Sequence, residues 1–589
     1  MMPVLLFLTP TWPLLLLALL VALRSAGASR TVFGWLWLTA PLPGLLLAAL
    51  ATGDPADTSL EMPWLLLGSL WWVDEVRQVF LLTTSLLWLF AGIYARGYLG
   101  ARADSDRLQL ARLRSFEYLW LLTLAGNLLL LIAEDIPSFY TGFVVMSFSA
   151  YGLVIHFRSP EALWAGRSYL YLAVLGEGFM LAGFLGTAAQ IPEPMMSQIP
   201  LILEPDNVSA LPLMLCLLLG FGVKAGLPLL HVWLPVAHSV APTPASAVLS
   251  GAMIKAGLLG WWLTLPLGSS NWPQVGQVLI VTGLVAALGA ALIGSLQQQA
   301  KAVLAYSSIS QMGMMTSLLG VGLIDPALWP LLVPALLLFV AHHGLNKGSL
   351  FLAVGIAEKL KTRWAPLLWI ALLLSPLALV GWLGSGTLTK TLMKSSLYSE
   401  GWSQLVFWLT LGLLGTALLM VRYLWLLSRM QKKLEEKQTP SPWMLVSWLL
   451  LLPLALLVPW WLPLPESTSL AWPDKKGWIG LAWPVAVAFV LAVMAWALTR
   501  KSSRWQNYAP PAGDLLIVYQ QAGRSLVAAF ERGVGWLQKF SQAGQKLFIG
   551  LRKLEPCLLR ISQQEIAWRR EAALLFSFLL VLLSGLLLL

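Results

Sequence analysis

Apolar runs of about twenty residues recur from one end of this chain to the other. A helix of that length is long enough to cross the ~30 Å hydrocarbon layer of a bilayer. The runs are continuous, as in LLLLALLVAL and LLFSFLLVLLSGLLLL, whereas strands of a membrane barrel would alternate in polarity over short segments. The composition agrees, because 58% of the 589 residues are hydrophobic and only 11% are charged. We therefore predict an all-α polytopic membrane protein.

Counting these runs predicts about sixteen transmembrane helices. Their approximate bounds are 3–23, 33–52, 77–97, 115–133, 138–156, 165–189, 208–235, 243–265, 275–296, 302–324, 328–357, 364–395, 402–428, 442–463, 479–499 and 570–589. The first run has no basic segment before it and no small-residue cleavage site clearly after it, so we interpret it as a retained span. Basic residues gather in alternate loops, which predicts cytoplasmic loops there and both termini on the outer side. The net charge of +11 thus indicates orientation rather than a nucleic-acid partner.

Four lysines lie in or at the ends of predicted spans, namely Lys224, Lys255, Lys347 and Lys390. A charged side chain at mid-bilayer costs about 2.5–3.5 kcal/mol on insertion scales, so such residues indicate ion or proton translocation. Pro228 follows Lys224 by one turn, which predicts a break in that helix close to the lysine. A lysine near a helix end can also extend its amine to the interface, and for Lys224 this alternative stays open.

Lys390 follows a second predicted break, in the glycine-rich stretch 384–386. His343 precedes Lys347 by four residues and therefore shares a helix face with it. Histidine beside lysine suits a proton relay, because burial and mutual repulsion favour neutral forms that can accept a proton. For His342, a relay role and a packing role with a hydrogen-bonded ring are both open.

Acidic residues inside the predicted spans are scarcer than lysines. Glu177 lies midway along the sixth predicted span. An unpaired carboxylate is costly at that depth, so we expect a cation such as Lys224 to face it. Asp74 and Glu75, at the mouth of the third span, and Lys301, at the start of the tenth, are expected at the membrane interface.

A different pattern separates the fifteenth and sixteenth predicted spans. Residues 514–554 place apolar side chains at three- and four-residue spacing, with basic side chains on the other face. This pattern predicts an amphipathic helix lying along the cytoplasmic surface of the membrane, and a solvated cytoplasmic helix is the alternative.

Three segments of the chain resemble one family. They are KAGLPLLHVWLPVAHSVAPTPASAVLSGAMIKAG (224–257), AKAVLAYSSISQMG (300–313) and HHGLNKGSLF (342–351). In this order they resemble the proton-conducting, antiporter-like subunits of respiratory complex I, group 4 membrane hydrogenases and Mrp sodium/proton antiporters. The resemblance covers roughly residues 70 to 430. The amphipathic helix before a final span is similar to the long form of this family.

The resemblance implies two inverted five-helix repeats, each with a half-channel and a lysine on its broken helix. The implied regions are N-terminal helices at 1–112, a first repeat at 113–265, a second repeat at 266–430, C-terminal helices at 431–505, a lateral amphipathic helix at 506–569 and a final span at 570–589. By motif, Lys224 and Lys390 match the lysines of the two broken helices, and Lys255 matches the connecting lysine. The implied proton relay comprises Glu177, Lys224, His231, His238, Lys255, His342, His343, Lys347 and Lys390.

The chain departs from the family pattern in the fifth predicted span. Family members usually carry a glutamate there in a Trp-Glu-x-Met context, whereas this chain has Phe143 and Val144. Gln299 and Val236 also stand where the family usually has acids. These losses indicate a divergent branch and leave Glu177 as the carboxylate expected in the first half-channel.

The resemblance implies a proton-translocating component of a hetero-oligomeric complex in a bacterial inner membrane, driven by partner subunits. Cys216 and Cys557 are too few for a disulfide framework or a thiolate metal site, and the sequence shows no nucleotide-binding glycine loop and no haem-type signature. We therefore expect no cofactor, no metal and no catalytic centre on this chain. An Mrp-type antiporter subunit, the membrane subunit of an inorganic-carbon uptake system and a non-conducting structural anchor are the alternatives.

Overall fold

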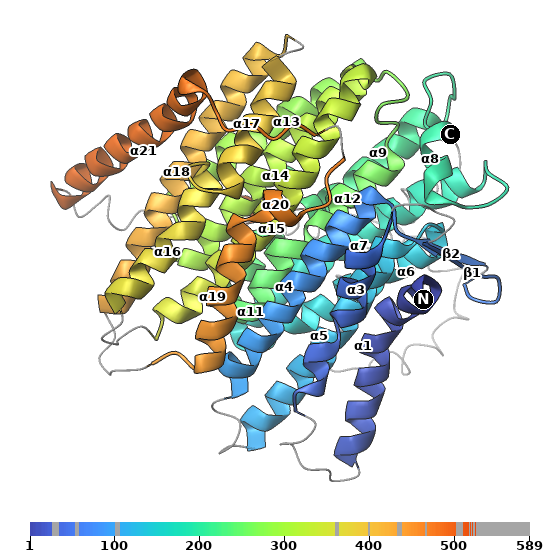
Figure 1. Ribbon diagram of the computed structural model, residues 1–589, viewed down its shortest axis with the longest axis horizontal. Helices are drawn as coiled ribbons and strands as arrows, with labels where there is room; N and C mark the ends of the chain where they lie inside the picture. Colours follow the sequence, from blue (N-terminus) through green and yellow to red (C-terminus); the bar gives the residue numbers. More distant parts are fainter. Residues whose placement is uncertain are drawn as a thin grey trace, which may run out of the picture. The chain divides into compact units, whose positions relative to one another are not determined.

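The computed structural model describes residues 1–25, 34–52, 58–66, 68–100, 107–359, 365–398, 401–432, 439–465, 468–501 and 510–516, with residues 519, 521 and 525. Over these ranges the chain is mostly helical (Figure 1). The chain divides into two units, Met1–Ala512 and Gly513–Leu589, and the architecture below is that of the first. Most of the predicted lateral helix and all of the predicted final span lie outside the described residues.

The first part of the fold holds N-terminal helices and a hairpin. Its elements are α1 (Met2–Ser25), η1 (Leu36–Thr39), α3 (Leu42–Leu50), β1 (Ser59–Met62), β2 (Ser69–Trp72) and α4 (Glu75–Gly100). The two strands pair antiparallel, with Ser59 opposite Trp72 and Met62 opposite Ser69. The sequence analysis predicted helices only, so the hairpin corrects that prediction. Strands of four residues are too short for their alternation to stand out from an apolar background.

The middle of the chain contains the first interrupted helix. Its elements are α5 (Arg107–Ile132), α6 (Ile136–Val154), α7 (Pro160–Ala188), η2 (Met196–Gln198), α8 (Ile199–Ile202), α9 (Ala210–Ala225), α10 (Trp233–Val240), α11 (Thr243–Val248), the π-helical turn η3 (Leu249–Met253) and α12 (Lys255–Thr264). Helix α5 packs along α6, α7 packs along α9, and α9 also contacts α12.

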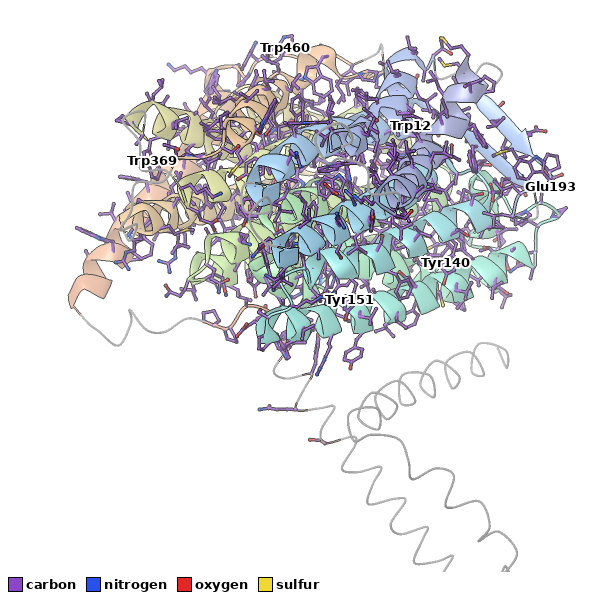
Figure 2. The ribbon with its side chains drawn as sticks, turned by 90° about the horizontal axis from the view of Figure 1, so that it is seen from below. Trp12, Tyr140, Tyr151, Glu193, Trp369 and Trp460 are labelled. Atoms are coloured by element: carbon purple, nitrogen blue, oxygen red, sulfur yellow. The ribbon has the colours of Figure 1, made fainter. Side chains whose placement is uncertain are left out.

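The rest of the described chain contains the second interrupted helix. Its elements are α13 (Pro273–Ser295), α14 (Ala300–Ile324), η4 (Pro326–Leu328), α15 (Trp329–Ala357), α16 (Ala365–Val380), α17 (Ser385–Tyr398), α18 (Ser403–Lys432), α19 (Pro442–Leu456), α20 (Val458–Trp461) and α21 (Lys475–Lys501). Helix α15 is central, because it contacts α4, α11, α14, α17 and α19. Figure 2 shows Trp369 of α16 and Trp460 of α20 at the outside of the bundle.

Eleven helical segments of the described chain are long and apolar enough to cross a membrane. They correspond to eleven of the sixteen predicted spans. Three more predicted spans appear as shorter apolar helices, at Leu36–Leu50, Ala210–Ala225 and Pro442–Leu456. Helix α6, with 19 residues, matches the fifth predicted span. The structure therefore agrees with a polytopic helical membrane protein, while the total of sixteen and the inverted repeats stay predictions.

A buried ion-pair network joins the hairpin to the helices that follow it. The Arg77 guanidinium donates to the carboxylates of Asp74, across 2.6 Å, and of Glu134, across 2.5 Å. The Trp72 indole and the backbone N–H of Ser197 also donate to the Glu134 carboxylate. Both Arg77 and Glu134 are buried. This network therefore ties α4, β2 and the segments flanking α6 and α7 together at one edge of the bundle.

Replacing Arg77 with alanine should lower the free energy of unfolding by about 3–5 kcal/mol, because Glu134 would keep a buried charge without a cation. Asp74→Asn should cost less than about 1 kcal/mol, since that side chain is 25% exposed and asparagine can still accept from the backbone N–H of Arg77. Unfolding titrations in mixed micelles measure both. A loss for Arg77→Ala no larger than that for Asp74→Asn would contradict the role of the network.

His156 is a buried histidine just beyond the end of α6. Its ring packs edge-on against Phe116 of α5, with centroids 5.4 Å apart. Burial lowers the pKa of His156 to about 4, and the positive charges of Arg112 and Arg158 add to the effect. The imidazole is therefore neutral in the folded protein at neutral pH.

Acidification should weaken the folded protein through His156. An unfolded histidine has a pKa of about 6.5, so the unfolded chain binds the proton first. The free energy of unfolding therefore decreases as the pH falls from about 6.5 to about 4, the pKa of His156 in the folded protein. The total decrease is on the order of 3 kcal/mol. His156→Phe should remove this component. Unfolding titrations at several pH values test it, and an identical pH dependence in both proteins would refute it.

Candidate functional site

The first helix break lies between α9 and α10, where the sequence predicted it. Helix α9 ends because Gly226 takes a φ of +80° and its N–H bonds the carbonyl of Gly222, while Pro228 cannot continue the helix. The indole N–H of Trp233 donates to the Val223 carbonyl across 2.8 Å. A carbonyl freed by the break thus finds its partner on the next helix.

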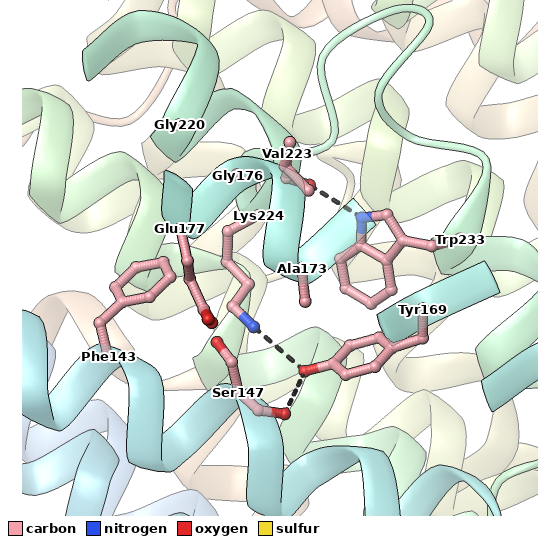
Figure 3. Close-up of a pocket in the computed structure, with 10 residues that line it drawn as sticks. All are labelled: Phe143, Ser147, Tyr169, Ala173, Gly176, Glu177, Gly220, Val223, Lys224 and Trp233. Atoms are coloured by element: carbon pink, nitrogen blue, oxygen red, sulfur yellow. Dashed lines mark hydrogen bonds between the residues drawn. The ribbon is translucent and has the colours of Figure 1, made fainter. Parts of the chain in front are cut away.

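Lys224 lies on the last turn of α9 and points into a small cavity lined by α6, α7, α9 and α10 (Figure 3). Its amine donates to the Tyr169 hydroxyl across 3.3 Å. That hydroxyl donates to the backbone carbonyl of Ser147, 2.8 Å away. The cavity leaves about 10 Å³ for the centre of a water molecule, which is room for roughly one water. The Lys224 side chain is 5% exposed, so its amine does not extend to the interface.

Glu177 faces the same cavity from α7 (Figure 3). Its side chain is buried, and its Oε1 atom has no hydrogen-bond partner among the described residues. No ion pair within 4.0 Å joins Glu177 to Lys224 in the described chain, so the two groups share the cavity without a direct salt bridge. A single water molecule in this space would be able to bridge the two groups.

Lys255 follows directly after the π-helical turn η3, which the sequence did not predict. Its amine donates to the Ser250 carbonyl across 2.8 Å. The Ser250 hydroxyl lies 2.7 Å from the Ser308 hydroxyl on α14, and the Ser308 hydroxyl donates to the Leu304 carbonyl across 3.0 Å. The amine of Lys347, on α15, donates to that same carbonyl across 2.8 Å. The hydroxyls of Ser250 and Ser308 and the carbonyls of Ser250 and Leu304, hereafter the serine track, thus lie between two buried lysines.

The second helix break separates α16 from α17. Gly381 and Gly384 adopt φ values of +99° and +51°, so the break begins three residues before the predicted stretch 384–386. A left-handed backbone is open to glycine at little cost, which explains why the chain turns here. The segment after the break carries Lys390 into the bundle.

Lys390 is buried among neutral partners. Its amine donates to the Gln311 side-chain carbonyl across 2.9 Å, and the Gln311 amide donates to the Thr416 hydroxyl across 2.7 Å. The amine also lies 3.6 Å from the centroid of the Phe339 ring. The sequence analysis named neither Gln311 nor Thr416, because one polar side chain in an apolar helix does not reveal which neighbour it meets.

His342 is held by hydrogen bonds. Its Nδ1 atom lies 2.8 Å from the Ser385 hydroxyl and 3.1 Å from the Asn346 amide nitrogen. The Ser385 hydroxyl donates to the Ala455 carbonyl across 2.7 Å. His342 therefore links α15 to the start of α17 and to α19, as the packing alternative expects, while a relay role stays a prediction.

The remaining predicted relay histidines lie in apolar surroundings. His343 is fully buried on α15, and neither ring nitrogen has a hydrogen-bond partner among the described residues. His238 of α10 is also fully buried and stacks on Phe351, with ring centroids 4.7 Å apart. His231 is buried in the connection between α9 and α10. The structure thus places His231 and His238 in and after the first helix break, and His342 and His343 on the continuous helix α15.

Lys301, which was expected at the membrane interface, is partly buried in the bundle. Its amine donates to the Ala241 carbonyl across 2.7 Å, at the C-terminal end of α10. A cation at a helix C-terminus is favourable because the last carbonyls carry partial negative charge. Lys301 therefore joins α14 to the first interrupted region, a contact that the sequence analysis missed.

The chain is similar to components of several membrane complexes. Residues 133–365 match the family described as NADH:quinone oxidoreductase/Mrp antiporter, TM. The chain is 30% identical over 308 residues to the Hydrogenase-4 component F homolog of Methylacidiphilum infernorum, over 50% of this chain and 63% of that protein. It is 31% identical over 303 residues to Hydrogenase-4 component B of Escherichia coli, over 49% and 44% of the two chains. It is 28% identical over 366 residues to a Na(+)/H(+) antiporter subunit of Alkalihalophilus pseudofirmus, over 58% and 44%.

These matches span less than two thirds of the length of each of these curated relatives. Two solved structures share the fold. One is the membrane-bound sulfane sulfur reductase, an archaeal respiratory membrane complex, with a TM-score of 0.62, 20% identity and coverage of 78% of this chain and 94% of that chain. The other is the Mrp complex from Dietzia sp. DQ12-45-1b, with a TM-score of 0.59, 21% identity and coverage of 83% and 94%.

Replacing Gly226 with alanine should lower the free energy of unfolding by about 1–2 kcal/mol, because a β-carbon disfavours the left-handed backbone of the break. The loss would come from the backbone alone, since the nearest atoms to an added Cβ lie at 3.7 and 3.8 Å. Gly289→Ala on α13, with nothing within 4 Å, is the matched control and should stabilise by about 0.5–1 kcal/mol. Unfolding titrations compare the two variants. A free energy of unfolding for Gly226→Ala equal to that of the unsubstituted protein would show that the left-handed backbone does not require glycine.

Proposed function

Because this chain belongs to the antiporter-like membrane subunits of the NADH:quinone oxidoreductase/Mrp antiporter family, we propose that it carries protons across a bacterial inner membrane as one component of a larger complex. The named relatives are Hydrogenase-4 component B, a Hydrogenase-4 component F homolog and a Na(+)/H(+) antiporter subunit. By analogy, other membrane subunits assemble with this chain, and the driving reaction takes place on them. The basic loops favour both termini on the outer side.

The serine track between Lys255 and Lys347 is the observation that supports this proposal most directly. Buried amines in an apolar bundle need polar partners, and these two amines donate to the backbone carbonyls of Ser250 and Leu304. The hydrogen-bonded pair of serine hydroxyls lies between those carbonyls. A carbonyl oxygen only accepts, so proton transfer requires each amine to turn from its carbonyl towards the neighbouring serine hydroxyl, which both donates and accepts.

The proposed route begins at the cavity that Lys224 shares with Glu177. Lys224 accepts a proton there and passes it to Lys255, and the serine track leads on to Lys347. The hydrogen bonds described above do not join Lys224 to Lys255, so this step needs a water molecule or a change of shape. Lys390, on the second interrupted helix, is the proposed release site.

His231 and His238, in and after the first helix break, and His342 and His343, beside Lys347, are the proposed intermediate carriers. An imidazole can hold or release a proton near neutral pH, and its two nitrogens allow transfer across the ring. His343 is the best placed of the two on α15, since its nitrogens are not engaged with other described residues.

Lys224→Ala, Lys390→Ala and Glu177→Gln should each lower proton flux by about tenfold or more, because each removes a group that holds the moving proton. Flux is measured with a pH-sensitive dye in vesicles that contain the assembled complex. Lys476→Met is the lysine control, since Lys476 is exposed at the start of α21 and lies outside the proposed route. Co-purification of the partner subunits establishes that each variant still assembles.

A pair of serine variants tests the route itself. Ser308→Ala interrupts the serine track and should lower flux, whereas Ser310→Ala should not. Ser310 lies on the same helix and is equally buried, but its hydroxyl donates to the Ala287 carbonyl of α13. Unchanged flux in the lysine and serine variants would instead identify a protein that anchors partners without conducting.

A further inference from the structure

Three aromatic rings surround the amine of Lys224 (Figure 3). The Lys224 amine lies 5.5 Å from the ring centroid of Phe143, 5.4 Å from that of Tyr169 and 5.8 Å from that of Trp233. A cation within about 6 Å of a ring face is attracted by the negative charge of the π electrons. The rings come from α6, α7 and α10, so the arrangement exists only in the folded bundle.

Each ring is fixed by its own contacts. The Trp233 indole N–H bonds a backbone carbonyl of α9, and the Tyr169 hydroxyl bonds a backbone carbonyl of α6. The Tyr169 and Trp233 rings also meet edge-to-face, with centroids 5.1 Å apart. Phe143 packs edge-on against Phe221, with centroids 5.9 Å apart. The rings are therefore held in place independently of the amine.

The charged and titratable side chains that line this cavity, apart from Lys224 itself, are Glu177 and Tyr169, both on α7. Neither is an ion-pair partner within 4.0 Å, so the amine lacks the direct carboxylate contact that usually accompanies a buried cation. The lining residues from α6 and α10 are uncharged. The polarity that a buried ammonium requires must therefore come in large part from the rings and the Tyr169 hydroxyl.

We propose that Phe143, Tyr169 and Trp233 form an aromatic cage that stabilises the ammonium form of Lys224 and holds it opposite Glu177. They are positioning residues, since they act through the lysine. A ring face attracts a cation less strongly than a touching carboxylate does. The caged amine can thus be charged in the bilayer and still release its proton, and this consequence rests on the proposed function.

The second interrupted helix contains a similar contact. The Lys390 amine lies on the face of Phe339, at 3.6 Å from the ring centroid, and its other described partner is the neutral Gln311 side chain. Lysines on both interrupted helices thus rest on aromatic faces. This recurrence supports a role for the rings beyond filling space.

The test replaces Phe143 with phenylalanines carrying one, two and three ring fluorines. Fluorine withdraws electron density from the ring face and nearly keeps its shape, so only the attraction for the cation weakens stepwise. The full chain, with its lysines labelled with ¹⁵N, is reconstituted in vesicles and titrated by solid-state NMR over a series of pH values. The Lys224 amine signal, assigned by its loss in Lys224→Met, gives the pH at which that amine is half protonated. We expect this pH to fall with each fluorine, by about half a unit to one unit in total.

The same fluorine series at Phe139 is the matched control. Phe139 is buried one turn earlier on α6 and contacts Phe143, Phe184 and Phe221, without a described contact to the lysine. No shift at Phe143, or an equal shift at Phe139, would overturn the aromatic cage. The NMR titration does not depend on flux, so a failure of the proposed function and a failure of the cage give different results.

Discussion

Each of the four lysine amines buried in this bundle rests on an oxygen atom or an aromatic face. The surrounding helices are apolar, and among the described residues none of these four amines has a carboxylate oxygen within 4.0 Å. A carbonyl within a regular helix can accept from a second donor, as the Leu304 carbonyl of α14 does from Lys347. The other three lysines lie beside irregular backbone, because Lys224 is on the last turn before a break, Lys255 follows a π-helical turn and Lys390 follows a second break. Irregular backbone thus accompanies three of the four buried lysines, while Lys347 lies within a regular helix.

The four amines nevertheless have unequal surroundings. Lys224 shares its cavity with a carboxylate and three rings, whereas Lys255 and Lys347 bond backbone carbonyls and Lys390 bonds an amide oxygen. A carboxylate attracts an ammonium more strongly than a neutral oxygen does. The surroundings of Lys224 therefore stabilise the ammonium form of a lysine more strongly than those of Lys390 do.

The sequence predicted the helical membrane class, most of the spans and both helix breaks, because these follow from hydropathy, proline and glycine. It also predicted that Glu177 and Lys224 face each other, since two lone charges in neighbouring apolar helices have few other partners. It missed the hairpin at Ser59–Trp72, the π-helical turn before Lys255 and the partners Ser308 and Gln311. Serine and glutamine occur in many membrane helices, so their presence alone does not identify a contact.

The sequence by itself determined which segments are long and apolar enough to cross a membrane, where the helices break and which apolar segments carry a charged residue, because each of these is a property of a local segment. The tertiary structure alone decided what each amine touches. Tyr169, Phe143 and Trp233 surround Lys224 from three helices, and the serine track requires α14 to lie between η3 and α15. Such contacts depend on the rotation and depth of whole helices against one another, which hydropathy and spacing leave undetermined.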